Sequence, residues 1–122
     1  MCQSCPCELV DPLAIAELRL NVGAAGVDDL LRSFFREARE RLAALRALTV
    51  DRAESIRLQL HTLHGAAGMF GFTRLSALVR KLHAESDALS PDAYRLSLDE
   101  IARTLAASCQ AFAELKSRPP SS

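Results

Sequence analysis

The chain has 122 residues, of which 49% are hydrophobic and 25% are charged. This length and composition are typical of one globular domain and exclude a catalytic domain joined to a separate regulatory domain. The 15 basic residues balance the 15 acidic ones, so net charge would not attract nucleic acid or an anionic membrane. No apolar run reaches the ~20 residues of a membrane span, and the first residues lack the regions of a signal peptide. We expect a cytoplasmic protein that binds neither nucleic acid nor membrane.

Three of the four cysteines, Cys2, Cys5 and Cys7, lie close together at the N-terminus. They could bind zinc, but a structural zinc site usually needs a fourth ligand, and no suitably spaced Cys or His follows them. The alternative is a flexible N-terminus with reduced thiols. We assign residues 1–10 to this flexible segment, 11–116 to a helical domain and 117–122 to a disordered tail.

Two helices are predicted in the first part of the domain. Residues 11–22 form a short amphipathic helix, with Asp11 as N-cap and Pro12 at the first position. Gly23 and Gly26 are predicted to end it. A long helix follows over residues 27–48. The expected inward positions of the two helices are Leu13, Ala16, Leu18, Leu20, Leu30, Leu31, Phe34, Phe35, Ala38, Leu42, Leu45 and Leu48.

Three further helices are predicted after residue 50. The third covers residues 51–70, with Asp51 and Glu54 as a reciprocal N-terminal cap and Gly71 in the left-handed conformation after its end. The fourth runs from Thr73 to about Leu89, and the last begins at Ser90 and Pro91. Their expected inward positions are Leu75, Leu78, Val79, Leu82, Leu98, Ile101, Leu105, Cys109, Phe112 and Leu115. Cys109 is therefore predicted to be a small core side chain.

These segments predict an all-α fold. Short connections between long amphipathic helices favour antiparallel neighbours. We expect an up-down-up-down four-helix bundle with a short extra N-terminal helix, and a monomer.

The third helix carries an unusual group of residues on one flank. At 100° per residue, its apolar positions Ile56, Leu60, Leu63, Ala67 and Phe70 fall within about 80° and mark the core side. The flank away from this stripe contains Arg57, His61, His64, Gly65 and Gly68. Glycine inside a helix costs about 1 kcal/mol relative to alanine, so two glycines here need a compensating role. Gly65, one turn beyond His61, would leave the imidazole uncovered.

An uncovered imidazole can act as a nucleophile near neutral pH. Arg57 and His64 are placed to neutralise the oxygens of a phosphoryl group on His61. Two simpler interpretations remain open at this point: His61 is an ordinary surface histidine, or His61 and His64 form an adventitious metal pair.

The run from His61 to Gly71 resembles the signature of histidine phosphotransfer (HPt) domains, H-x-L-K-G followed by small residues and a glycine ten positions after the histidine. His61, Leu63, Gly65 and Gly71 fit this signature. The family's L-L-x-x-F pattern is matched upstream by Leu30, Leu31 and Phe34, and the resemblance spans about residues 11–115.

The resemblance implies that His61 carries a phosphoryl group between the receiver domains of response regulators or hybrid histidine kinases. It implies no cofactor in this chain, since magnesium is expected in the partner receiver domain. Two positions depart from the family pattern. His64 replaces the usual lysine, and His83 follows Leu82 where the family often has glutamate. We assign no function to His83 and expect it to be a solvated helix residue.

Three alternatives compete with this interpretation. A non-catalytic helical interaction module would bind partners without phosphate transfer. A metal-binding bundle would need ligands that face the core, whereas His61 and His64 point away from it. A kinase fragment would need a glycine-rich nucleotide loop, which the sequence lacks. We therefore expect a phosphohistidine carrier rather than an enzyme.

Overall fold

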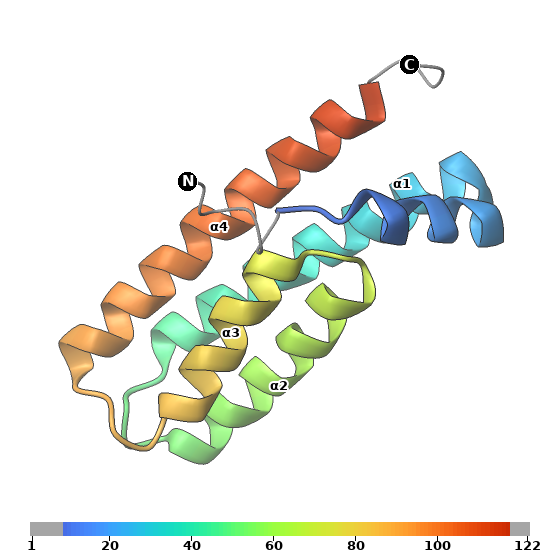
Figure 1. The fold of residues 1–122 in the computed structure, drawn as a ribbon. Coiled ribbons are helices and arrows are strands. Elements are labelled where there is room, and N and C mark those ends of the chain that lie inside the picture. The colour runs from blue at the N-terminus through green and yellow to red at the C-terminus, as the bar shows by residue number, and fades with distance from the viewer. Residues whose placement is uncertain (1–8, 118–122) are drawn as a thin grey trace.

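The computed structural model describes residues 9–117, and this part of the chain forms four helices and no strand. The helices are α1 (Pro12–Ala47), α2 (Ala53–Met69), α3 (Thr73–Glu85) and α4 (Pro91–Ser117). Figure 1 shows α2 and α3 side by side, and α4 contacts both α3 and α1. The prediction of an all-helical domain is confirmed. Cys2, Cys5 and Cys7 lie outside the described residues, as do residues 118–122 of the predicted tail.

α1 covers both helices that were predicted before residue 50, and it changes direction at Gly23. This residue has φ 79° and ψ 167°, a conformation that a side chain would oppose. Figure 1 shows a shorter segment of α1 before this point and a longer one after it. Gly26 lies inside the helix, so its predicted role in ending a helix is wrong. One positive-φ residue is enough to redirect the chain.

The shorter segment of α1 begins on the turn between α2 and α3. The backbone N–H of Asp11 donates to the carbonyl of Gly71 at 2.8 Å. The Asp11 carboxylate accepts from the N–H of Leu13 at 3.0 Å, which confirms Asp11 as N-cap. Ile15 occupies the buried side of this segment. The predicted inward positions Leu13 and Leu20 are wrong, since they are 74% and 88% exposed.

The core runs the length of the four helices. An aromatic cluster lies beneath the α2–α3 turn, where the rings of Phe34 and Phe72 stack at 5.2 Å and Phe35 and Phe70 pack against them. Phe72 was not predicted as a core residue because it lies in the turn, outside any helical periodicity. The fully buried side chains of largest volume are Phe72, Ile15, Leu31, Leu45, Ile56, Leu60, Leu63, Leu75, Leu82, Leu98, Ile101 and Val27. Cys109 is half-buried and packs against this core.

Two predicted helix ends differ from the structure. α2 starts after Arg52 without a side-chain cap, so the predicted cap by Asp51 and Glu54 is wrong. The Asp51 carboxylate instead accepts a hydrogen bond from the Thr49 hydroxyl, and this bond lowers the pKa of Asp51 below its ordinary value. α3 ends at Glu85, four residues before the predicted end. The Ser86 hydroxyl donates to the carbonyl of His83 at 2.9 Å at this end.

Two other predicted helix ends are confirmed. Gly71 has φ 83° after the end of α2. The Ser90 hydroxyl accepts from the N–H of Ala93 at 3.1 Å at the start of α4. These ends set where α3 and α4 begin, and therefore which of their residues face the rest of the bundle.

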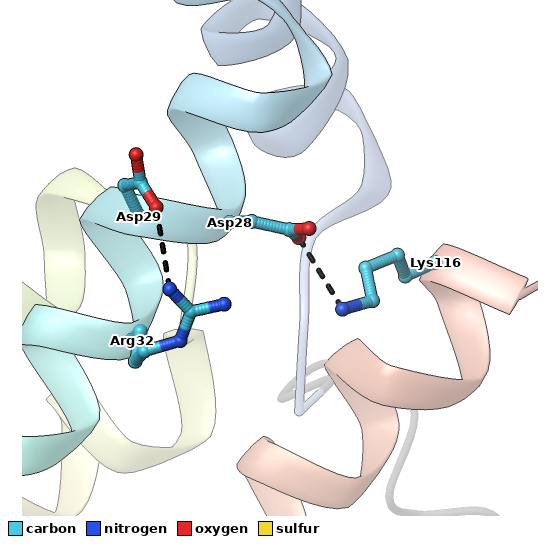
Figure 2. A network of polar contacts seen from close by, with 4 residues as sticks. All are labelled: Asp28, Asp29, Arg32 and Lys116. Carbon is cyan, nitrogen blue, oxygen red and sulfur yellow. Dashed lines mark hydrogen bonds and ion pairs between the residues drawn. The ribbon is translucent and has the colours of Figure 1, made fainter.

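Polar contacts tie α4 to α1 at both ends of the pair. The Tyr94 hydroxyl donates to the carbonyl of Leu45 at 2.6 Å. At the other end, Lys116 Nζ lies 3.4 Å from Asp28 Oδ1 (Figure 2). Figure 2 also shows Arg32 and Asp29, which form an exposed ion pair within α1 at 3.2 Å. No helix in the described part of the chain combines the length and the apolar character needed to cross a membrane.

Candidate functional site

The flank of α2 that faces away from the core contains side chains that could bind a ligand or take part in a reaction. Leu60 and Leu63 are 0% and 2% exposed, so they fix the rotation of α2 about its axis. His61 lies between them in sequence and is exposed, while His64 is half-buried. The core residues therefore determine that the His61 ring faces outward.

Three positions of α2 lie opposite residues of α3 or of the segment just after it along this flank. Arg57 Nη1 lies 2.5 Å from Asp87 Oδ1, just beyond the end of α3. The rings of His61 and His83 have centroids 6.4 Å apart, with a 50° angle between their planes. Farther along, a Cβ added at Gly68 would lie 3.6 Å from the hydroxyl of Ser76. Positions that come later in α2 thus lie opposite positions that come earlier in α3.

His61 stands at the edge of a cavity of about 210 Å³ between α2 and α3. The cavity is lined by His61, His64, Arg80 and His83. Two of the four side chains come from each helix. No carboxylate lines it, and none of the ion pairs formed within residues 9–117 involves Arg80. A small cavity with a guanidinium and three imidazoles suits an anion.

Gly65 leaves open space beside His61. A Cβ added at Gly65 would meet no atom within 4 Å, so packing does not require glycine at this position. Gly71 differs, because its φ is 83° and an added Cβ would lie 2.6 Å from the Cβ of Ala14. Gly71 is therefore needed for the fold. Gly65 has no such structural requirement, and it lies one helical turn after His61.

The structure brings together some of the sequence-predicted site residues and separates others. His61 and His64 line the same cavity, and Gly65 lies one helical turn after His61. Arg57 does not line the cavity and is bound to Asp87 instead. Gly68 lies farther along α2, opposite Ser76.

Sequence reasoning missed Arg80 and His83. His83 was expected to be a solvated residue, which is wrong: it is half-buried and its ring faces that of His61. The sequence positions of His61 and His83 could have predicted that these two residues lie opposite each other. His61 and His83 are equally distant from Phe72 in the turn between two predicted helices, and such positions face each other in a helical hairpin.

No three His, Cys, Asp or Glu side chains among residues 9–117 are grouped in a way that could hold a metal ion. His64 and Arg80 line the same cavity, and the fixed positive charge of Arg80 opposes the binding of a cation there.

The sequence matches the family model described as Hpt domain over residues 29–115. Comparisons with curated proteins and with solved structures gave no match. The matched range includes α1 from residue 29 onward, all of α2 and α3, and α4 up to residue 115, so it contains every residue that lines the cavity beside His61. HPt domains are phosphohistidine carriers of two-component signalling and are not kinases. The chain belongs to the HPt domain family.

Proposed function

We propose that His61 accepts a phosphoryl group from the aspartate of one receiver domain and passes it to the aspartate of another. The observation that carries this proposal is the exposed imidazole of His61 at the edge of a cavity that is lined by imidazoles and the guanidinium of Arg80 and by no carboxylate. Gly65 supports it, because the space beside the ring is open to a partner's backbone or side chains. Membership of the HPt family supports the class of partner.

In the accepting step, the lone pair of one ring nitrogen of His61 forms a bond to phosphorus. The bond between phosphorus and the aspartate oxygen breaks, and its electron pair returns to the carboxylate. The second ring nitrogen keeps its proton. Neutral imidazole is the reactive form. The reverse sequence on a second receiver returns His61 to its starting state.

A receiver domain would dock over the outer flank of α2. His61, Gly65 and the 74% exposed Met69 lie along this helix. Transient exchange between two partners requires a modest interface that releases quickly. The ion pair of Arg57 with Asp87 lies at the edge of this docking surface that is nearest the start of α2. It links this part of α2 to the residues just after α3.

Phosphoryl transfer from a labelled receiver domain tests the proposal. The His61→Gln protein should take up no label, should melt at the temperature of the wild type, and should keep its circular dichroism spectrum. Arg103→Gln, an exposed change on α4, serves as the control and should accept label normally. Wild-type label should be acid-labile. Transfer retained by His61→Gln would move the site to His64 or His83, and stable receiver binding without label would favour the interaction module.

We further propose an up-down-up-down arrangement of the bundle with a separate N-terminal helix, which the short connections and the opposite directions of α2 and α3 support. We also propose that the protein is a cytoplasmic monomer without a cofactor of its own, that magnesium is bound by the receiver partner, and that the protein binds neither nucleic acid nor membrane.

A further inference from the structure

We propose that Arg80 and His83 of α3, together with His64 of α2, bind the phosphoryl oxygens on His61, and that phosphorylation therefore draws protons onto His64 and His83. This inference rests on the proposed function, because it concerns the phosphorylated state of His61.

The geometry places three cationic or titratable groups around one imidazole. The ring of His83 lies 6.4 Å from that of His61, measured between centroids. His64 and Arg80 line the same cavity of about 210 Å³. A phosphoryl group is small enough for such a space and carries three strong acceptor oxygens. The cavity therefore offers donors from two helices to one tetrahedral anion.

The charges around the cavity favour an anion and leave its donors available. Arg80 is exposed and forms none of the ion pairs within the described part of the chain. The carboxylate of Asp87, just beyond the end of α3, is bound to Arg57. On the other side of α3, where α4 packs, Glu85, Lys81 and Glu100 surround a separate small cavity that His83 does not line. No unpaired carboxylate thus competes with a phosphoryl group at the cavity.

Two of the three residues proposed to contact the phosphoryl group, His64 and His83, are histidines, a residue type whose charge can change in the physiological pH range. Arginine stays protonated, whereas imidazole titrates near 6.5 in model peptides. A nearby dianion favours the imidazolium form, so phosphorylated His61 should raise the protonated fractions of His64 and His83 at a given pH. By linkage, proton uptake stabilises the phosphorylated state as pH falls. The lifetime of the phosphoryl group would then depend on pH through residues on both helices.

The test begins by loading His61 with phosphoramidate, a small donor that releases ammonia as the phosphoryl group moves to the histidine. Histidine ring titrations by NMR then compare the free and phosphorylated wild-type protein. The midpoints for both His64 and His83 should rise by at least about 0.5 pH unit on phosphorylation. A purely structural role of His83 would not produce this shift, so an unchanged His83 midpoint overturns the inference.

The lifetime of the label tests Arg80. If Arg80 contacts the phosphoryl oxygens more strongly in phosphorylated His61 than in the transition state of hydrolysis, as the proposed binding requires, it slows the loss of the phosphoryl group. Arg80→Gln should therefore lose label about threefold faster than wild type at pH 7, a change within the range of one exposed ion pair. Lys81→Gln removes the neighbouring charge outside the cavity and should keep the wild-type lifetime.

Three results separate the possible failures. If Arg80→Gln and Lys81→Gln lose label equally fast, the inference is wrong although His61 still carries phosphate. If Arg80→Gln is partly unfolded, Arg80→Lys must restore the lifetime for the inference to stand. If no donor labels His61, the proposed function fails first, and the inference falls with it.

Discussion

The two sides of α2 differ in what they contribute to the protein. The inner side, formed by Ile56, Leu60, Leu63 and Ala67, is at most 2% exposed and supports the fold. Burial of a large apolar side chain stabilises a protein by about 1.5–3 kcal/mol. The outer side contains His61, Gly65 and Gly68, and glycine in a helix interior destabilises it by about 1 kcal/mol relative to alanine. The side of α2 that supports the fold is thus separate from the side that carries the proposed site.

This separation explains how His61 can stay exposed in a fixed position. The inner side holds α2 in one rotation against the core, so the outer side needs no packing of its own. The polar groups of the interior are paired: no buried side-chain nitrogen or oxygen in the described part of the chain lacks a hydrogen bond. On the outer flank, Arg80 remains outside the ion pairs found there, which leaves its guanidinium for a ligand.

Leu60→Ala should have the largest effect on stability. Removal of a fully buried leucine should lower the free energy of unfolding by about 2–5 kcal/mol, measured by urea denaturation. Leu58→Ala, at a 66% exposed position of the same helix, is the matched control and should change it by less than about 0.5 kcal/mol. Equal losses at the two positions would contradict the division of α2 into a supporting side and a functional side.

Tyr94→Phe tests whether the interior depends on its buried hydrogen bonds. Loss of the bond to the Leu45 carbonyl should cost about 0.5–1.5 kcal/mol at pH 7. Burial raises the pKa of Tyr94 above its ordinary value of 10.0, so the folded protein binds this proton more tightly than the unfolded chain. This contribution is complete below pH 10 and is lost as pH rises through the folded pKa.

Wild type should therefore lose stability relative to Tyr94→Phe in alkaline solution. Tyr94 is the only tyrosine in the sequence, so tyrosinate absorbance reports its titration directly. Lysines titrate in the same pH range, and their contribution to stability is the same in both proteins, so the difference between the two proteins reports Tyr94 alone. A difference in stability that stays constant from pH 7 to pH 11 would show that the hydroxyl is not buried as described.

Gly65→Gln should separate stability from transfer. The space at Gly65 admits a side chain, so the variant should melt at the wild-type temperature or above, with a gain of up to about 1 kcal/mol. Its rate of label uptake from a phosphorylated receiver should fall on the order of tenfold, because a longer side chain obstructs in-line approach to His61. Gly65→Ala is the control and should be stabilised without this loss. Unimpaired uptake by Gly65→Gln would refute the steric role of the glycine.

His64→Lys should leave stability unchanged and should alter only the response to pH. A lysine keeps its charge between pH 6 and 8, whereas an imidazole loses it as pH rises. The phosphotransfer equilibrium of the variant should therefore depend less on pH than that of wild type. His64→Gln should retain phosphate less well but still transfer it. Identical pH profiles for wild type and His64→Lys would mean that titration of His64 has no part in the mechanism.

Local features of the structure were largely predictable from sequence. Asp11, Gly71 and Ser90 fulfil their predicted roles at helix ends, because short-range hydrogen bonds and backbone conformation depend on neighbouring residues. The prediction failed at Asp51, where Thr49 competes for the carboxylate. It also failed at Gly26, because Gly23 alone redirects the chain.

The sequence by itself determined the helical class, the inner stripe of α2 and the outward direction of His61, since all three depend on residue spacing along one helix. The tertiary structure decided which side chains surround His61. Arg80 and His83 reach it only because α3 folds back along α2, and Arg57 is drawn to Asp87 by the same pairing. Contacts between helices depend on where a turn places two surfaces, and periodicity within one helix does not contain that information.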